Sequence, residues 1–123
     1  MAQYYRIVVE SKGIYEAVQQ QCPKGDSRRF NKPDGSWLIK AGEKYPGAIS
    51  FWTEKGIKKY DESGLLDWHI SVVKGQVYAL IIDRPNKVLY TDDYQIICQP
   101  REVTLKKKET IKEFIKEIHT STF

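Results

Sequence analysis

Short apolar runs alternate with polar turns along most of the chain, and this pattern predicts a series of strands. The expected strands are Tyr4–Val9, Ser36–Lys40, Ala48–Trp52, the second half of Leu65–Val73, Val77–Ile82, Val88–Tyr90 and Tyr94–Cys98. Lys74 and Gly75 lie between two of these runs and are typical of a tight hairpin turn. Such a turn makes at least part of the sheet antiparallel.

Two short helices are predicted between the strands. Ser11 is a suitable N-cap for a helix over Gly13–Gln21. Thr53 is expected to cap a second helix, which closes at Gly64 because glycine readily takes the conformation that ends a helix. Loops are expected where Pro, Gly, Asp, Ser and Asn are dense, at residues 23–36 and 41–47.

The C-terminal segment has the clearest helical pattern of the chain. Apolar residues recur there with the spacing of one helical stripe, at Ile111, Phe114, Ile115 and Ile118. Thr110 and Glu113 fit a capping box at the start of this helix. Because so large an apolar stripe must be buried, we expect the helix to pack on the sheet or on a second subunit. A homodimer through this helix is therefore one expectation.

These elements predict an α+β fold with a mostly antiparallel β-sheet core, a short N-terminal helix, a short middle helix and a C-terminal amphipathic helix. The 123 residues, 41% hydrophobic and 12% aromatic, suit a single domain over residues 1–123 with one packed core. No βαβ series and no glycine-rich fingerprint is present, which excludes a dinucleotide-binding fold of the doubly wound type.

Charge and cysteine content narrow the functional classes. The formal net charge of +4 is mild for a dedicated DNA-binding domain. No apolar run approaches the roughly 20 residues of a membrane span, and the N-terminus lacks the pattern of a signal peptide. Cys22 and Cys98 are too far apart in sequence to suggest a zinc site, so we expect no metal. We interpret both as reduced thiols of a cytoplasmic protein.

Two single residues could carry chemistry. Arg6 lies on a strand that is apolar on both faces, so it is expected at the edge of a cleft or beside an acidic partner. His69 has two interpretations, a half-buried strand histidine, which we favour, or a general base or nucleotide contact. Of the three tryptophans, Trp52 follows the middle strand's Ser50 and could line an aromatic cleft.

Two short polar segments are further candidates. Asp92 and Asp93 are either turn residues that interrupt a strand or paired carboxylates that contact a ribose or a cation. In the basic loop over residues 24–32, Arg28, Arg29 and Phe30 suit a nucleotide or RNA contact, because arginine neutralises phosphate and phenylalanine stacks on a base. The alternative is a solvated basic loop.

Three polar positions on different predicted strands are separated by nearly equal lengths of chain: Arg6, then Ser50 with Thr53, then Asp93 with Gln95. This order resembles the R–S–E arrangement of the ADP-ribosyltransferase family. The resemblance implies that Arg6 holds the phosphates of a dinucleotide. It also implies that Ser50 and Thr53 orient the nicotinamide ribose, and that Asp93 and Gln95 stand at the catalytic third motif.

The chain departs from the family at two motifs. Phe51 and Trp52 replace the small polar residues of the second motif, and Gln95 occupies the place of the catalytic glutamate. An amide cannot stabilise positive charge on the ribose as a carboxylate does. Either Asp92 or Asp93 substitutes for that glutamate, or the chain binds a nucleotide without turning it over.

The sequence thus leads to three functional hypotheses. The one we favour is a small nucleotide-binding protein with an ADP-ribosyltransferase-like core, whose ligand is NAD or a related nucleotide. The second is a module that binds RNA or another phosphate ligand through residues 24–32. The third is a protein-interaction or self-associating domain that uses the C-terminal helix.

Overall fold

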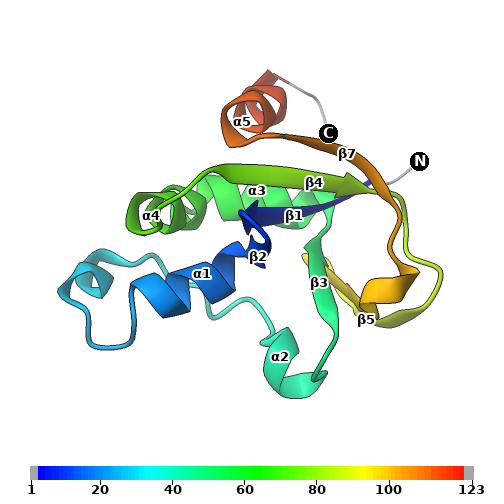
Figure 1. Ribbon diagram of the computed structural model, residues 1–123, viewed down its shortest axis with the longest axis horizontal. Helices are drawn as coiled ribbons and strands as arrows, with labels where there is room; N and C mark the ends of the chain where they lie inside the picture. Colours follow the sequence, from blue (N-terminus) through cyan, green and yellow to red (C-terminus); the bar gives the residue numbers. More distant parts are fainter. Residues whose placement is uncertain (1–2, 121–123) are drawn as a thin grey trace.

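The computed structural model describes residues 3–120, which form an α+β fold around one antiparallel sheet (Figure 1). Seven strands lie in this described part: β1 (Tyr4–Val9), β2 (Lys12–Gly13), β3 (Ile49–Trp52), β4 (Val77–Ile82), β5 (Val88–Thr91), β6 (Gln95–Cys98) and β7 (Leu105–Thr110). Their order across the sheet is β5-β6-β3-β1-β4-β7, and β2 pairs with β1. The predicted fold class is confirmed.

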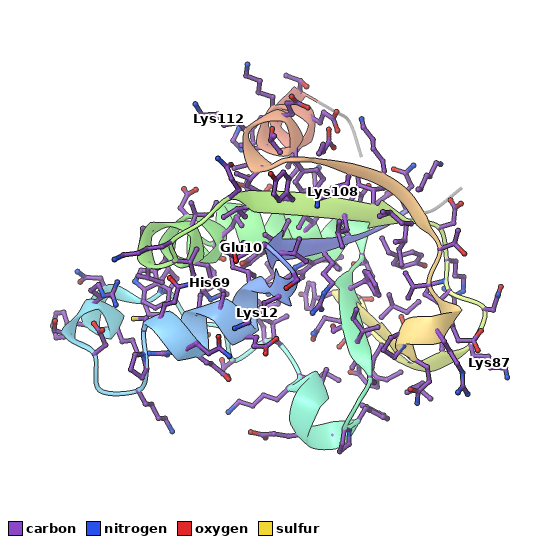
Figure 2. All side chains as sticks on the ribbon, viewed as in Figure 1. Glu10, Lys12, His69, Lys87, Lys108 and Lys112 are labelled. Atoms are coloured by element: carbon purple, nitrogen blue, oxygen red, sulfur yellow. The ribbon has the colours of Figure 1, made fainter. Side chains whose placement is uncertain are left out.

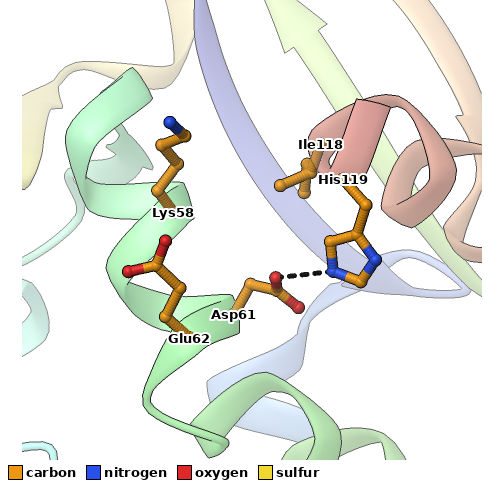
Figure 3. A pocket seen from close by; sticks show the side chains of 5 residues that line it. All are labelled: Lys58, Asp61, Glu62, Ile118 and His119. Carbon is orange, nitrogen blue, oxygen red and sulfur yellow. Dashed lines mark hydrogen bonds and ion pairs between the residues drawn. The ribbon is translucent and has the colours of Figure 1, made fainter. Parts of the chain in front are cut away.

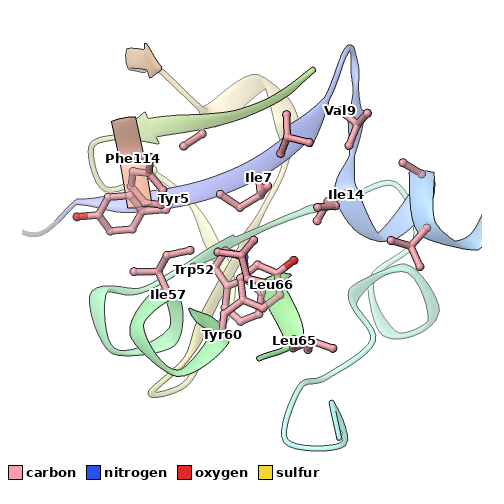
Figure 4. Packing of buried hydrophobic residues seen from close by; sticks show 14 of the residues in the cluster. Tyr5, Ile7, Val9, Ile14, Trp52, Ile57, Tyr60, Leu65, Leu66 and Phe114 are labelled. Atoms are coloured by element: carbon pink, nitrogen blue, oxygen red, sulfur yellow. The ribbon is translucent and has the colours of Figure 1, made fainter. Parts of the chain in front are cut away.

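Five helices accompany the sheet within the described residues. They are α1 (Ile14–Gln21), α2 (Ala41–Lys44), α3 (Glu54–Glu62), α4 (Leu65–Val72) and α5 (Ile111–Thr120), with 3-10 turns η1 (Ser27–Asn31) and η2 (Pro100–Glu102). Four of the helices, α1, α3, α4 and α5, enclose the larger core on one face of the sheet. The larger core joins Tyr5, Ile7 and Val9 of β1 to residues of α1, α3, α4 and α5 (Figure 4). A smaller core on the opposite face contains Tyr4, Phe51, Ile82, Ile96 and Cys98. The first strand is therefore buried on both faces.

Local chemistry starts α3 directly after β3, as predicted. The Thr53 hydroxyl accepts a hydrogen bond from the Gly56 amide at 2.9 Å and so caps the helix. Gly56 lies so close to the Tyr94 carbonyl that a Cβ at this position would overlap it. Gly64, with φ of 82°, takes the left-handed conformation between α3 and α4.

The prediction of a strand in the second half of Leu65–Val73 is wrong, because this segment is helix α4. Leu65, Leu66, His69 and Val72 are buried, and their spacing is that of one helical face rather than of alternating strand positions. The turn at Lys74 and Gly75 consequently joins a helix to β4 and is not a hairpin. The antiparallel pairing of β4 is instead with β1 and β7.

The segment Ser36–Lys40 is not a strand either. Asp34 folds it into a turn, because its carboxylate accepts hydrogen bonds from the Ser36 amide at 3.1 Å and the Ser36 hydroxyl at 2.9 Å. The Leu38 amide then donates to the Gly35 carbonyl at 3.1 Å. Two predicted loops contain short helices, η1 in the first and α2 in the second.

Two further differences arise from contacts between distant segments. Ser11 does not cap α1, whose N-cap residue is Gly13 without a side-chain hydrogen bond, because Lys12 and Gly13 pair with β1 as strand β2. The sequence pattern does not indicate β7, since its lysines lie on both faces. Lysines such as Lys108 (Figure 2) are typical of an edge strand, where they discourage pairing with another chain.

The C-terminal helix packs on the chain's own sheet. Phe114 and Ile118 are buried in the larger core, and the Phe114 ring lies 5.4 Å from that of Tyr5. Half of the predicted capping box is present, since the Glu113 amide donates to the Thr110 hydroxyl at 3.4 Å. The apolar stripe that suggested a dimer is thus largely used within the monomer, and the dimer stays a prediction.

The two cysteines, Cys22 and Cys98, are buried free thiols. Within residues 3–120, no helix is long and apolar enough to cross a membrane. Over the same range, no cluster of three or more histidine, cysteine or acidic residues suitable for a metal ion is found.

Candidate functional site

Arg6 lies where the two central strands separate. Strands β1 and β3 pair at Tyr5 and Trp52, and further along β1 the hairpin strand β2 takes the place of β3. The Arg6 guanidinium spans this junction, because Nη1 donates to the Ser50 carbonyl at 3.0 Å while Nη2 lies against Gly13. A Cβ at Gly13 would overlap Nη2, so this glycine makes room for the guanidinium.

The charge of Arg6 is not neutralised by an adjacent carboxylate. Burial lowers the pKa of Arg6, and the more distant charge of Glu16 partly offsets this effect. Among residues 3–120, no acidic side chain forms an ion pair with Arg6. Of the two sequence-based expectations for Arg6, the ion pair with an acidic side chain is not present within residues 3–120, and a position at the edge of a cleft stays a prediction.

Gln95 and Ser50 lie on adjacent strands and contact one another. The Gln95 side chain donates from Nε2 to the Ser50 hydroxyl at 3.1 Å. Its Oε1 accepts a hydrogen bond from the Ile39 amide at 2.9 Å, and Nε2 also lies 3.5 Å from the Ile39 carbonyl. Ile39 belongs to the segment 32–40, which we call the strap. Arg6 and Gln95 thus contact different groups of Ser50, its backbone carbonyl and its hydroxyl. Strand alternation places the Ser50 and Gln95 side chains on the larger-core face with Trp52, whereas Arg6 leaves β1 on the face of Tyr4.

Thr53 and Asp93 are also neighbours, but their polar groups are already engaged. The Thr53 hydroxyl donates to the Asp93 carbonyl at 2.6 Å besides capping α3. The Thr53 amide donates to the Tyr94 carbonyl at 3.0 Å. The Asp93 carboxylate forms an exposed ion pair with Lys55 at 3.3 Å. The start of α3 is thus covered by the turn before β6 and is not an open anion site.

Asp92 is a turn residue and not one of a carboxylate pair. Its Oδ1 accepts hydrogen bonds from the Tyr94 and Gln95 amides, each at 2.8 Å, and its Oδ2 accepts one from the Tyr90 hydroxyl at 2.7 Å. Burial by itself would raise the pKa of Asp92, but these hydrogen bonds outweigh burial and hold the pKa below its usual value. Of the two interpretations of this dipeptide, the structure favours the turn.

His69 lies in the larger core, between α4 and α1 (Figure 2). Its side chain is 1% exposed, and Nδ1 shares a hydrogen bond of 2.5 Å with the Tyr60 hydroxyl. Burial lowers the pKa of His69 to about 3, with smaller contributions from the positive charges of Lys32 and Arg29. This histidine is therefore a neutral core residue on a helix rather than a half-buried strand residue.

Trp52 is likewise in the core, and its ring is stacked on that of Tyr60 with the centroids 4.4 Å apart.

The arginines of the basic loop serve mainly to hold the loop itself. Arg28 forms an ion pair with Asp26 at 2.9 Å and donates to the Gln21 carbonyl at the same distance. Arg29 donates to the Cys22 carbonyl at 2.8 Å. Phe30, the third candidate, points outward with 92% of its surface exposed. In the described chain, no hydrogen bond or ion pair links this loop to Arg6, Ser50 or Gln95.

Sequence reasoning did not identify the aromatic clasp, which we define as Trp37, Lys59 and Tyr94. The Lys59 ammonium lies 4.7 Å from the centre of the Trp37 ring and 4.5 Å from that of Tyr94. The two rings meet edge to face at 5.1 Å. The sequence does contain one indication of the clasp. Trp37 closely follows the turn residues Asp34 and Gly35, and a tryptophan beside such a turn needs an apolar contact elsewhere in the fold.

A second polar group lies in a groove between α3 and α5, on a different part of the surface. Figure 3 shows Asp61 and His119 facing one another across this groove, with an Oδ2–Nε2 distance of 2.8 Å. Lys58, Glu62 and Ile118 complete its lining, and its volume is about 370 Å³. This hydrogen bond attaches the last turn of α5 to α3.

Comparisons with protein-family models, with curated proteins and with solved structures found no match.

Proposed function

We propose that this protein binds NAD or a related nucleotide at Arg6, Ser50 and Gln95, in a core that resembles that of the ADP-ribosyltransferases. One observation carries the proposal. Two residues far from Ser50 in the sequence contact it: Arg6 Nη1 lies 3.0 Å from its carbonyl oxygen, and Gln95 Nε2 lies 3.1 Å from its hydroxyl. In the proposed complex, these are the groups that hold the phosphate and ribose portions of the ligand.

The state of Arg6 supports an anionic ligand. A guanidinium has five N–H donors in a planar fork that suits phosphate. Within the described residues, the hydrogen bond to the Ser50 carbonyl engages one of them, and no carboxylate competes for the charge. A partly buried cation without an acidic partner is stabilised by a bound phosphate more strongly than an exposed lysine would be.

The third motif supports binding without turnover. Gln95 is an amide, Asp92 is tied into the turn before β6, and Asp93 pairs with Lys55. None of the three thus offers an unengaged carboxylate to the ribose, which is the group that the transfer reaction needs. We therefore propose a nucleotide-binding role and do not assign a catalytic residue.

A thermal-shift titration tests this proposal, with NAD, ADP-ribose, adenosine and nicotinamide as separate ligands. A ligand that binds only the folded state at about a hundred times its dissociation constant stabilises it by about 2.7 kcal/mol, so NAD should raise the melting temperature by several degrees. Arg6→Ala should weaken NAD binding about 10- to 100-fold, because it removes charged hydrogen bonds to phosphate.

The control is Arg101→Ala, whose side chain is 81% exposed on η2 and which should leave NAD binding unchanged. Equal loss of binding in both variants would indicate a general effect of charge. No shift with saturating NAD or ADP-ribose would contradict the proposed function.

A steric variant tests the same contact without removing a charge. Gly13 has φ of −60° and ψ of 147°, which alanine also adopts, so Gly13→Ala introduces no backbone strain. Its Cβ must displace the Arg6 guanidinium, and we expect NAD affinity to fall about tenfold while the free energy of unfolding changes by less than about 1 kcal/mol. Gly42→Ala, where a Cβ meets open space, is the matched control. Unchanged affinity in Gly13→Ala would remove Arg6 from the site.

A further inference from the structure

The strap, residues 32–40, contacts Gln95 of the candidate site without joining the sheet. It lies wholly within the described residues and contributes neither a strand nor a helix. Its own turn is held by Asp34, so Asp34 to Leu38 forms a small self-contained unit. Attachment to the rest of the fold must therefore come from side chains, which makes the strap separable from the sheet in a way that a paired strand is not.

The first attachment is the side chain of Gln95. Its amide contacts both backbone polar groups of Ile39, the N–H at 2.9 Å and the carbonyl at 3.5 Å, while also donating to the Ser50 hydroxyl. Gln95 is 7% exposed. With the strap in this position, the nitrogen and the oxygen of the Gln95 amide are both engaged by Ile39, and Gln95 is buried while Ser50 is half-buried.

The second attachment is the aromatic clasp. Trp37 of the strap packs against Trp52 at 5.7 Å and holds the Lys59 ammonium between itself and Tyr94. At the N-terminal end of the strap, Pro33 lies beside Gly64 and Gly35 beside Leu65. These contacts are side-chain packing and a cation–π pair, and none of them requires backbone pairing to be broken when the strap lifts.

We propose that the strap is a lid over the nucleotide site, and that a ligand with a carboxamide, such as the nicotinamide ring of NAD, replaces Ile39 on Gln95. This inference rests on the proposed function. A carboxamide presents an N–H donor and a carbonyl acceptor, which are the two groups that Ile39 now supplies to Gln95. The strap and the ligand thus compete for the Gln95 amide, and ligand binding lifts the strap.

Amide hydrogen exchange followed by NMR tests the lid in the free protein. We expect the Ile39 amide to exchange by local opening, at least a hundredfold faster than the Ile7 amide in the central strand β1. Gln95→Met keeps the length of the side chain and removes its hydrogen bonds, so Ile39 exchange should rise about tenfold further. Gln99→Met is the matched control and should not change it. Trp37→Leu provides a second way to loosen the strap if Gln95→Met folds poorly.

Repeating the exchange measurement with added ligand distinguishes the lid from the proposed function. NAD should speed exchange at Ile39, whereas ADP-ribose, which lacks the nicotinamide, should leave it unchanged even though it binds. Exchange of Ile39 as slow as that of Ile7 would overturn the lid, whatever the nucleotide result. Slower exchange at Ile39 with NAD bound would overturn the displacement. A strap that opens locally, together with no thermal shift from any nucleotide, would overturn both the proposed function and the carboxamide exchange.

Discussion

Replacing Gly56 with alanine is expected to destabilise the fold by about 3 kcal/mol, at the upper end of the usual effect of overpacking. In an exposed helix, the same change would stabilise by roughly 0.5–1 kcal/mol, because glycine is the poorer helix former. The sign is reversed here because a Cβ at Gly56 would overlap the backbone carbonyl of Tyr94. A backbone atom cannot move aside as the end of a flexible side chain can.

The Gly56→Ala substitution should also disturb structure outside α3. The Tyr94 carbonyl accepts a hydrogen bond from the Thr53 amide at 3.0 Å, so moving it disturbs the turn that leads into Gln95. Urea unfolding of Gly56→Ala and of Gly42→Ala measures the effect against a glycine in a short helix where a Cβ meets open space. Equal stability of the two variants would show that α3 and the turn before β6 are not in close contact.

Lowering the pH is expected to destabilise the protein, beginning at pH values above those at which most carboxylates titrate. The pKa of His69 is lowered by burial from 6.5 to about 3, so between these values the unfolded chain holds a proton that the folded chain does not. The stability that the neutral imidazole provides is complete above pH 6.5 and is lost as the pH falls toward 3. At about 1.4 kcal/mol per pH unit, the loss near pH 4 is roughly 3 kcal/mol.

The environment of His69 explains why its protonation in the folded state is so unfavourable. Tyr60 engages Nδ1, the Tyr15 ring lies 4.7 Å away edge-on, and Lys32 and Arg29 add positive charge nearby. Burial raises the pKa of Glu109, which lies beside Glu117. The protonation of Glu109 therefore favours the folded state as the pH falls, opposite to the effect of His69. The difference between wild type and His69→Gln isolates the contribution of the histidine from that of this acid.

The measurement is the free energy of unfolding in urea at several values between pH 7 and pH 4. His69→Gln should flatten the dependence, since glutamine has no proton to gain. His119→Gln is the matched control, because His119 is 59% exposed, and it should keep the steep slope. An equally steep slope in His69→Gln would mean that acid sensitivity arises elsewhere.

Much of the local structure was predictable because its causes lie within a few residues. Thr53 caps α3 through the amide three residues later, and the helical stripe of Phe114 and Ile118 is visible in the sequence alone. The second half of Leu65–Val73 is predicted as a strand because its apolar run fits either periodicity, and only the joint burial of Leu65 and His69 decides for helix α4. β7 carries no apolar signal, since its position at the sheet edge exposes most of its side chains.

The candidate site was predictable in part. The order of Arg6, Ser50 and Gln95 along the chain predicts three different strands, and the sheet order, which the sequence does not indicate, makes these strands neighbours. The strap was not predictable, because its path depends on Gln95 reaching a backbone group in a distant loop. The arginines of the basic loop looked available in sequence, yet the carbonyls of Gln21 and Cys22 engage them.

The proposed nucleotide site lies where Arg6 and Gln95 contact Ser50. An NMR titration of the isotopically labelled protein with NAD tests it most directly. The account predicts that the largest shift changes fall on the Arg6 Nε–H, the Ser50 amide and the Gln95 side-chain amide. Changes confined to residues 24–32 or to α5, or no changes at saturating NAD, would contradict it.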